Sequence, residues 1–234
     1  MMDVVSVQRL IAACGHLDGK DLLEAVLLGD LMGRVAVTSS FGAESAVLLD
    51  LVAQVDPATP VIFLDTGELF DETVEYRYQL ERRLGLTNVV VVKPTPEELA
   101  EAEDLWRADS DRCCELRKVR PLARIAKGYD ALVDGRKRAH GAERQHLSAI
   151  EEVGGVIKIS PLANWSAEEV ETAFKTRDLP RHALVSQGYR SIGCWPCTRP
   201  TAEGESPRAG RWAGQAKTEC GIHTNDLGRD GAGL

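Results

Sequence analysis

The sequence predicts an α/β fold in which helices cover both faces of a mostly parallel, twisted sheet. Short β-branched runs alternate with longer amphipathic segments, as expected for successive strand–helix–strand units. Beyond about residue 186 this alternation stops, and Gly, Pro and Arg become frequent. We therefore expect an α/β domain with N-terminal helices over residues 1–185, a loop-rich C-terminal segment of the same domain over 186–224, and a disordered tail over 225–234.

Each strand is predicted from a short β-branched run, and each helix from apolar residues at helical spacing. The predicted strands are residues 34–37, 61–64, 89–92, 131–133 and 156–159. One or two helices are expected at about 4–32, and others at 46–52, 68–84 and 111–127. Thr95 and Ser166 each begin a further helix. Thr95 is followed by proline and then by a capping-box glutamate, which together indicate a helix start.

The composition is that of an ordinary globular protein. The 234 residues are 44% hydrophobic and 27% charged, and the formal net charge is −8. Because non-specific binders of nucleic acids or membrane surfaces are usually basic, we expect neither partner. No secretory signal begins the sequence, and no apolar run reaches the roughly 18 residues that span a bilayer. We expect a cytoplasmic protein, in which six cysteines serve as metal ligands or catalysts rather than as disulfides.

Polar residues follow two of the predicted strands, at the edge of the sheet where ligands bind. The segments are residues 38–42, directly before a helix, and residues 65–67. Backbone N–H groups and hydroxyls at such a turn bind phosphate oxygens, aided by the helix dipole. The first turn is neither a Walker A loop nor a dinucleotide fingerprint, and a plain turn with a capping serine is the alternative.

Four cysteines form an adjacent pair and a Cys-x-x-Cys motif: Cys113, Cys114, Cys194 and Cys197. Cys-x-x-Cys is a common half-site for zinc or an iron–sulfur cluster. Adjacent cysteines seldom serve a structural zinc ion, whereas each thiolate of a [4Fe–4S] cluster binds a different iron. The spacing therefore favours [4Fe–4S], with structural zinc as the alternative. Lys118, one helical turn later, lies where its charge can tune the cluster or meet a substrate anion.

Cys220 stands apart from these four, between Lys217 and His223. Both neighbours can stabilise a thiolate, and Gly221 allows a substrate or a protein partner to approach closely. We interpret Cys220 as a nucleophile on a mobile segment, the alternative being a packed or surface thiol. Cys14, on an N-terminal helix, is interpreted as a core residue.

Cationic residues gather in two runs, residues 136–144 and 199–211. Arginine forks match the oxygens of phosphate and sulfate. Such runs are also common on solvated surfaces, but these lie near the cysteine motifs of an acidic protein. We therefore expect them to bind an anionic substrate.

Over about residues 33–223 the chain resembles the cluster-containing adenylyl-sulfate (APS) reductases of the PAPS-reductase family. The resemblance is carried by SSFGAE at 39–44, FLDTG at 63–67, CCELRKV at 113–119, SIGCWPCTR at 191–199, RAGRW at 208–212 and ECGIH at 219–223. The three cysteine motifs in this order are highly specific. The resemblance implies an adenine nucleotide α-hydrolase fold, related to the PP-loop ATP pyrophosphatases.

The resemblance also implies a role for each motif. The four clustered cysteines would hold [4Fe–4S], and catalysis would fall to Cys220 and His223. The phosphosulfate or ribose would contact Ser39, Ser40, Phe41 and Gly42. The nucleoside pocket would be lined by Leu64, Asp65, Thr66 and Gly67. The phosphosulfate would be surrounded by Lys118, Lys137, Arg138, Arg144, Arg208 and Arg211. Many relatives read Gly-Leu-Arg-Arg where this chain has GRKR at 135–138, and many carry a histidine where it has ADSDR at 108–112.

The implied activity is reduction of adenylyl sulfate to sulfite and AMP in assimilatory sulfate reduction and cysteine biosynthesis. Cys220 would take up the sulfo group as an S-sulfocysteine, and thioredoxin or a glutaredoxin-like dithiol would release sulfite. A PAPS or dual APS/PAPS reductase is the near alternative. A second enzymatic alternative is a PP-loop tRNA thiolase, which would need a Ser-Gly-Gly-x-Asp-Ser loop that the sequence lacks. The non-enzymatic alternative is a cysteine–metal module that serves as a redox sensor or interaction domain. Homo-oligomers are compatible with the family, although no stripe in the sequence identifies an interface.

Overall fold

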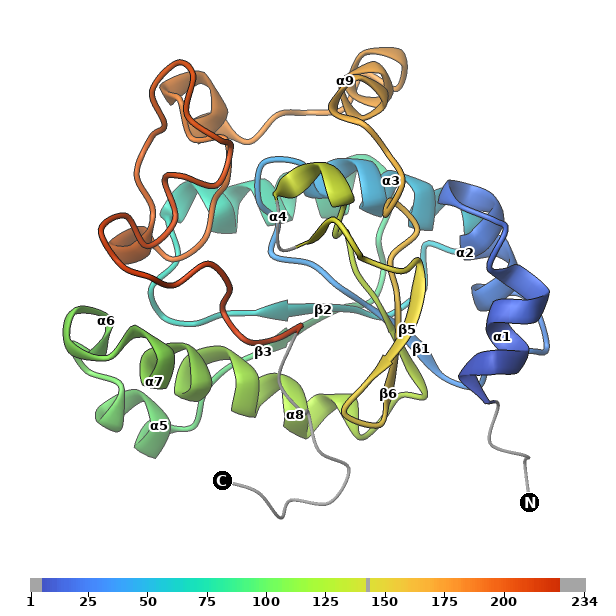
Figure 1. Cartoon of the computed structure of the whole chain (residues 1–234), viewed down its shortest axis with the longest axis horizontal. Helices are drawn as coiled ribbons and strands as arrows, with labels where there is room; N and C mark the ends of the chain where they lie inside the picture. Colours follow the sequence, from blue (N-terminus) through green and yellow to red (C-terminus); the bar gives the residue numbers. More distant parts are fainter. Residues whose placement is uncertain (1–5, 142–143, 224–234) are drawn as a thin grey trace.

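A computed structural model describes residues 6–141 and 144–223. These residues form a six-stranded sheet in the order β3-β2-β1-β4-β6-β5 (Figure 1). Neighbouring strands are parallel, except that β5 runs antiparallel to β6 at one edge. The strands are β1 (Val35–Thr38), β2 (Val61–Leu64), β3 (Val89–Val92), β4 (Ala131–Val133), β5 (Ile150–Val153) and β6 (Val156–Ile159). The predicted, mostly parallel α/β fold is confirmed.

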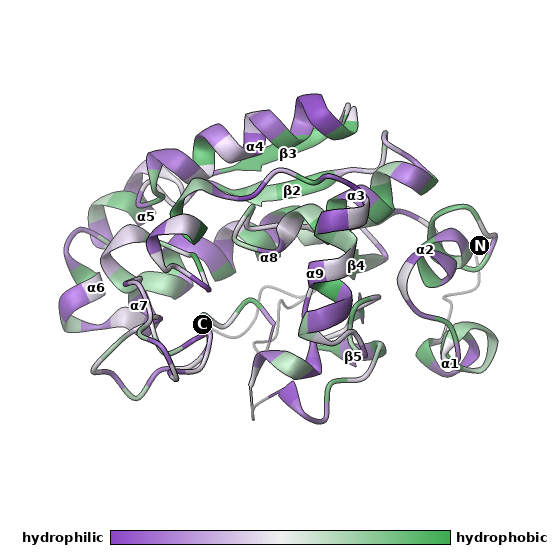
Figure 2. Ribbon diagram, turned by 90° about the horizontal axis from the view of Figure 1, so that it is seen from above, coloured by the Kyte–Doolittle hydropathy of each residue, from purple (hydrophilic) through white to green (hydrophobic). Residues whose placement is uncertain are grey.

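Helices lie on both faces of this sheet. The α-helices are α1 (Val7–Cys14), α2 (Gly19–Leu27), α3 (Ser45–Val55), α4 (Asp71–Leu84), α5 (Pro96–Glu101), α6 (Leu105–Ala108), α7 (Ser110–Cys114), α8 (Arg120–Ala126) and α9 (Ala167–Thr176). In Figure 1, α3 and α4 lie on one side of the strands and α8 on the other. Figure 2 shows β2 and β3 as mostly hydrophobic and α4 as mostly hydrophilic, as expected of a covered sheet and a surface helix.

Alternating residues of β1 build the two apolar layers. Val35 and Val37 belong to a large buried cluster that includes residues of α1–α4 and α9, whereas Ala36 belongs to a smaller cluster with residues of α8. Val37 lies level with Val61 of β2 and with Val133 of β4. Because these strands are parallel and in register, the loops that follow them emerge at the same edge of the sheet.

The N-terminal helical region is two helices, within the expected one or two, because Gly15 to Asp18 break the first before the second begins. Two other local features differ from the sequence-based expectation. The strand β5 was not predicted, although the alternation on either side of Gly154 and Gly155 signals a hairpin. The helix predicted over 111–127 is α7 and α8 joined by a π-helical segment, Glu115–Val119. The caps predicted at Thr95 and Ser166 are both capping boxes.

The C-terminal part of the described chain has little regular structure. Between residues 188 and 223 it contains one short 3₁₀ turn, η5 (Trp195–Cys197). The division near residue 185 stays a prediction, and the tail predicted over 225–234 lies outside the described residues. Within the described ranges, no helix combines the length and apolarity needed to cross a membrane.

Candidate functional site

A pocket of about 240 Å³ opens at the carboxyl ends of the parallel strands. The strand side of the pocket includes Thr38 at the end of β1, Leu64 at the end of β2, and Asp134 just after β4. The opposite side is formed by the C-terminal segment, which includes Cys220 and His223. Figure 1 shows this segment returning to the sheet. The structure thus brings the predicted nucleophile to the strand ends.

The turn after β1 is fixed by its own serines. Ser39 Oγ accepts a hydrogen bond from the Phe41 N–H at 3.1 Å, and Ser45 Oγ accepts one from the Gly42 N–H at 2.9 Å. Ser39, Ser40 and Gly42 line the pocket. Phe41 does not, because its backbone turns at a φ of 47° and its ring packs edge-on against Phe63 in the core, with no exposed surface. The expectation of a substrate contact at Phe41 is therefore corrected to a packing role.

Of the four residues predicted to line the nucleoside pocket at the end of β2, two line the pocket and two do not. Leu64 and Thr66 line the pocket, whereas Asp65 and Gly67 do not. The Asp65 carboxylate accepts from the Gly67 N–H at 3.1 Å and pairs with Lys93 at 3.2 Å, so it stabilises the turn itself. Thr66 Oγ1 lies 3.3 Å from Cys194 Sγ and links this strand end to the cysteine motif.

Most of the predicted cations surround the pocket. Those that line it are Lys118, Lys137, Arg144, Arg208 and Arg211. Arg138 is the exception, because its guanidinium donates to the Leu147 carbonyl at 2.8 Å and to Asn164 Oδ1 at 2.5 Å. Arg136 lines the pocket, but its side chain is held by Asp134 and Glu151.

Two carboxylates organise these cations, and sequence reasoning gave neither a role in the pocket. Glu219 pairs with Arg144 at 2.6 Å and with Arg208 at 3.2 Å. Glu44 pairs with Lys137 at 2.9 Å and with His140 at 2.8 Å. Burial opposes ionisation of Glu44, but these two neighbours outweigh it and lower the pKa of Glu44 to about 2. The sequence signal for a role of Glu44 in the pocket was its position directly after the strand-end turn.

Arg211 differs from the other arginines of the pocket. Among the described residues it makes no ion pair, and its buried Nε has no hydrogen-bond partner. The guanidinium lies over the Trp212 ring, with Cζ 4.4 Å from the ring centroid. Because a buried donor without an acceptor is costly, Arg211 is suited to an anionic ligand in the pocket.

Beside Cys220 in the pocket, the partly buried His223 pairs with the buried Asp134. His223 Nδ1 lies 3.5 Å from Asp134 Oδ2. The carboxylate also accepts from the Ser160 hydroxyl at 2.8 Å and from Arg136 Nε at 2.9 Å. Burial opposes ionisation of Asp134, but His223 and Arg136 together hold its pKa well below the usual range. Burial also lowers the pKa of His223, which favours a neutral ring. Cys220 itself is half-buried in the pocket.

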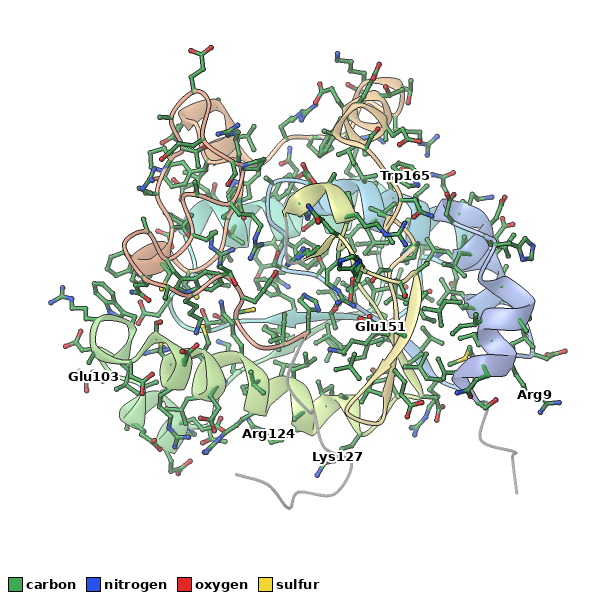
Figure 3. The ribbon with its side chains drawn as sticks, in the orientation of Figure 1. Arg9, Glu103, Arg124, Lys127, Glu151 and Trp165 are labelled. Atoms are coloured by element: carbon green, nitrogen blue, oxygen red, sulfur yellow. The ribbon has the colours of Figure 1, made fainter. Side chains whose placement is uncertain are left out.

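The four clustered cysteines line a second, smaller pocket. Cys113 and Cys114 end α7, and Cys194 and Cys197 bracket the η5 turn, in which the Cys197 N–H donates to the Cys194 carbonyl at 3.1 Å. Cys194 and Lys118 line both pockets, so the cysteine group adjoins the pocket that holds Cys220. Figure 3 shows sulfur atoms between the C-terminal segment and α7.

The donor set of this second pocket suits a four-iron cluster. Within the described residues, no three His, Cys, Asp or Glu side chains come close enough to hold a single metal ion. Four thiolates that each bind a different iron need not converge in that way. Burial and mutual repulsion raise the pKa of Cys113 to about 11 and also raise that of Cys197. A bound metal cluster would supply the positive charge that stabilises these thiols as thiolates.

The sequence comparisons agree with this arrangement. Residues 34–200 match the family model described as the phosphoadenosine phosphosulfate reductase domain. A protein from Chelativorans sp. (strain BNC1), named adenosine 5′-phosphosulfate reductase, is 49% identical over 95% of this chain and 93% of its own length. A protein of the same name from Mesorhizobium japonicum is 45% identical over 93% of this chain and 87% of its own length.

The structural comparisons point in the same direction. The crystal structure of phosphoadenylyl-sulfate (PAPS) reductase from Candida auris superimposes with a TM-score of 0.69 at 27% identity, over 82% of this chain and 96% of that one. Yeast FAD synthetase, with a TM-score of 0.53 at 16% identity over 83% of this chain and 74% of its own, shares the fold alone. These likenesses confirm the predicted PP-loop-related fold. The chain belongs to the phosphoadenosine phosphosulfate reductase family.

Proposed function

We propose that this protein is an enzyme that reduces adenylyl sulfate to sulfite and AMP. The observation that carries the proposal is the placement of Cys220 in one pocket with the strand-end serines and the cations, next to the pocket of four cysteines. The names of the relatives at 49% and 45% identity support APS as the substrate, and the family supports a role in sulfate assimilation.

The geometry of the pocket supports one orientation of the substrate. The apolar residues Leu64 and Leu69 are suited to the nucleoside, and Ser39 and Ser40 to the ribose or the phosphate. Arg211, with its unpartnered Nε, and Lys118 are suited to the phosphosulfate. This orientation directs the sulfo group towards Cys220.

The first chemical step is an in-line displacement. The Cys220 thiolate attacks the sulfur of the sulfo group; an S–S bond forms and the O–S bond to the phosphate breaks. AMP leaves with the electron pair, and Lys118 and Arg211 offset the negative charge that develops on its phosphate. The neutral His223, oriented by Asp134, can take the proton of the Cys220 thiol. The product is an S-sulfocysteine at position 220.

The second step needs a dithiol, for which we propose thioredoxin or a glutaredoxin-like protein. A reductant thiolate attacks Cys220 Sγ, sulfite leaves with the electron pair, and a mixed disulfide forms. The second thiol of the reductant resolves it, so that the reductant becomes a disulfide and Cys220 a thiolate again. Because Cys220 is half-buried here, this step requires the C-terminal segment to move outwards.

We further propose that Cys113, Cys114, Cys194 and Cys197 hold a [4Fe–4S] cluster. When bound, such a group supplies charge and rigidity next to the substrate, whereas the two thiols of the reductant supply both electrons. Lys118 lines the boundary between the two pockets and is placed to bind the substrate anion there. A brown protein with broad absorption near ~400 nm after anaerobic purification is the expected sign of the cluster. A colourless, zinc-containing protein contradicts this part of the proposal.

The proposed function is tested with APS alone, without any reductant. Intact-mass spectrometry is expected to find one added SO₃ per chain, with peptide mapping assigning it to Cys220, and one equivalent of AMP released. The matched variant Cys220→Ser is expected to keep its iron and to take up no SO₃. Absence of the adduct in wild-type enzyme that holds its full complement of iron refutes the proposal. A comparison of kcat/KM for APS and PAPS tests the choice of substrate, and a value at least as high for PAPS would reverse it.

A further inference from the structure

Lys158 is a buried lysine on the strand next to one edge of the sheet, where an ammonium group is costly to place. It lies on β6, between β4 and β5, and only 2% of its surface is exposed. The proposed chemistry assigns it no role. Burial lowers the pKa of Lys158 to about 8, although Asp134, Glu151 and Cys220 favour its charged form. Such a group requires a structural or functional reason.

Strand alternation explains where the Lys158 side chain points. Val156 and Lys158 are two residues apart and share one face of β6, and Val156 belongs to the apolar cluster that includes residues of α8. The aliphatic stem of Lys158 therefore starts on the face of β6 that bears this apolar cluster. Its Nζ donates a hydrogen bond of 2.8 Å to the backbone carbonyl of Ile222.

Ile222 lies two residues after Cys220, so the bond restrains the segment that carries the nucleophile. The Ile222 side chain packs against the same apolar cluster, so the lysine and the core hold this residue together. On the other side of Cys220, Glu219 is held by two arginines. The thiol is thereby restrained through its neighbours on both sides.

The charges around Lys158 come from three elements. Asp134 and Arg136 follow β4, Glu151 lies directly opposite Lys158 on β5, and Cys220 and His223 belong to the C-terminal segment. Glu151 is labelled in Figure 3 beside β5. The carboxylates of Asp134 and Glu151 are both paired with Arg136. Among the described residues, the Ile222 carbonyl is the hydrogen-bond acceptor of Lys158.

We propose that Lys158 is a positioning residue that holds the Cys220 segment in the pocket by its hydrogen bond to the Ile222 carbonyl. When the segment moves outwards, the buried ammonium loses this acceptor, so inward placement of Cys220 and burial of Lys158 stabilise each other. The kinetic part of the proposal rests on the proposed function. The placement of the segment does not, because it can be measured without substrate.

The first test measures access to Cys220 in the full, iron-loaded chain. Lys158→Met keeps the stem and removes the donor. Labelling of Cys220 by N-ethylmaleimide, followed by peptide mapping, is expected to be about tenfold faster in this variant, the effect of losing one hydrogen bond to a charged group. If Lys158 acted only through its charge, Cys220 would be labelled more slowly in Lys158→Met, because loss of a nearby cation disfavours the reactive thiolate. The control Lys175→Met, on α9 with a side chain 73% exposed, is expected to label at the wild-type rate.

The second test separates the two half-reactions. Formation of the S-sulfocysteine from APS requires the segment to be in its inward position, so this step is expected to be about tenfold slower in Lys158→Met. Release of sulfite from the preformed intermediate by dithiothreitol does not require that position and is expected not to slow. Lys158→Arg, which keeps a charged donor, is expected to restore both rates towards wild type. Before labelling, the iron content and circular dichroism spectrum of each variant are compared with those of wild type. If Lys158→Met differs from wild type in either, Lys158→Gln replaces it with the same expectations, because the glutamine amide is too short to reach Ile222.

Two results overturn the proposal. One is labelling of Cys220 at or below the wild-type rate in the variant that lacks the donor. The other is an equal loss in both half-reactions, which indicates general damage to the site. If wild-type enzyme takes up no SO₃ from APS, the proposed function fails, but the labelling result still decides whether Lys158 holds the segment.

Discussion

Substitution of Gly193 by alanine tests whether Arg211 binds the reacting anion. Gly193 directly precedes the cysteine Cys194, and the guanidinium of Arg211 occupies the space that a β-carbon at position 193 would need. A β-carbon at position 193 would lie 2.5 Å from Arg211 Cζ and 3.0 Å from its Nη1. Because the obstructing atoms are the end of a flexible side chain, we expect Gly193→Ala to fold and to displace Arg211.

The size of the effect follows from the packing. Carbon atoms in contact prefer separations of about 3.5 Å, so the guanidinium must retreat by about 1 Å. A misplacement of about 1 Å at a catalytic group can cost about a hundredfold in rate. Loss of a single hydrogen bond to a charged group corresponds to about 1.5–3 kcal/mol, or roughly 10- to 150-fold in kcat/KM. We therefore expect kcat/KM for APS to fall by between ten- and a hundredfold in Gly193→Ala.

A double-mutant cycle with Arg211→Ala provides the assay and its control. Sulfite or AMP production is measured with saturating dithiol, and iron content is checked in each variant because Gly193 adjoins a cysteine of the second pocket. If the alanine acts through Arg211, it is expected to cost little further activity in the Arg211→Ala background. Two fully additive losses, or wild-type activity in Gly193→Ala, would refute the assignment of Arg211 to the reacting anion.

Three further predictions separate structural from functional residues. Arg138→Ala is expected to change kcat/KM for APS less than threefold, because its guanidinium faces Leu147 and Asn164 and not the pocket; a tenfold loss in steady-state assays would contradict this. Phe41→Leu is expected to lower the free energy of unfolding by about 1–3 kcal/mol in urea titrations, the cost of changing shape at a fully buried site, while the KM for APS changes little. Glu44→Gln is expected to be less stable than wild type above about pH 4.5, because the ion-paired carboxylate of Glu44, whose pKa is lowered, stabilises the fold only while it is charged. The difference in unfolding free energy between the two proteins is expected to shrink as the pH falls towards 2. Urea unfolding at pH 7 and pH 3.5 measures this difference, and a constant value would argue against the ion pairs.

The fold was predictable because its signals are local. The inner parallel strands β1, β2 and β4 are short, mostly buried apolar runs, and such runs stand out from the amphipathic helices between them. The edge strand β5 was harder to see because its Glu151 and Glu152 interrupt the apolar run. The π-helical segment after Cys114 has no local sequence signal, since it depends on how α7 and α8 pack against the rest of the chain.

The site was predictable only as far as each residue type has a fixed chemistry. Cysteines in two close groups and arginines near them indicate a cluster and an anion wherever the chain folds. Which of Arg136, Lys137 and Arg138 enters the pocket is decided by partners distant in sequence. Arg138 is drawn away by Asn164, and Lys137 is held by Glu44, 93 positions earlier in the numbering. Consecutive cations in a loop carry no periodicity from which these pairings could be read.

The contacts around Cys220 explain how one thiol can serve two partners. The described contacts that restrain its segment fall on its neighbours: Glu219 binds Arg144 and Arg208, and Ile222 binds Lys158. Hydrogen bonds donated to the thiolate sulfur itself would lower its pKa and, with it, its intrinsic nucleophilicity. Restraint through its neighbours leaves the sulfur free to attack, and ion pairs that are partly exposed to water are weak enough to break when a reductant approaches. Inward placement for attack and outward movement for reduction are therefore compatible within one short segment.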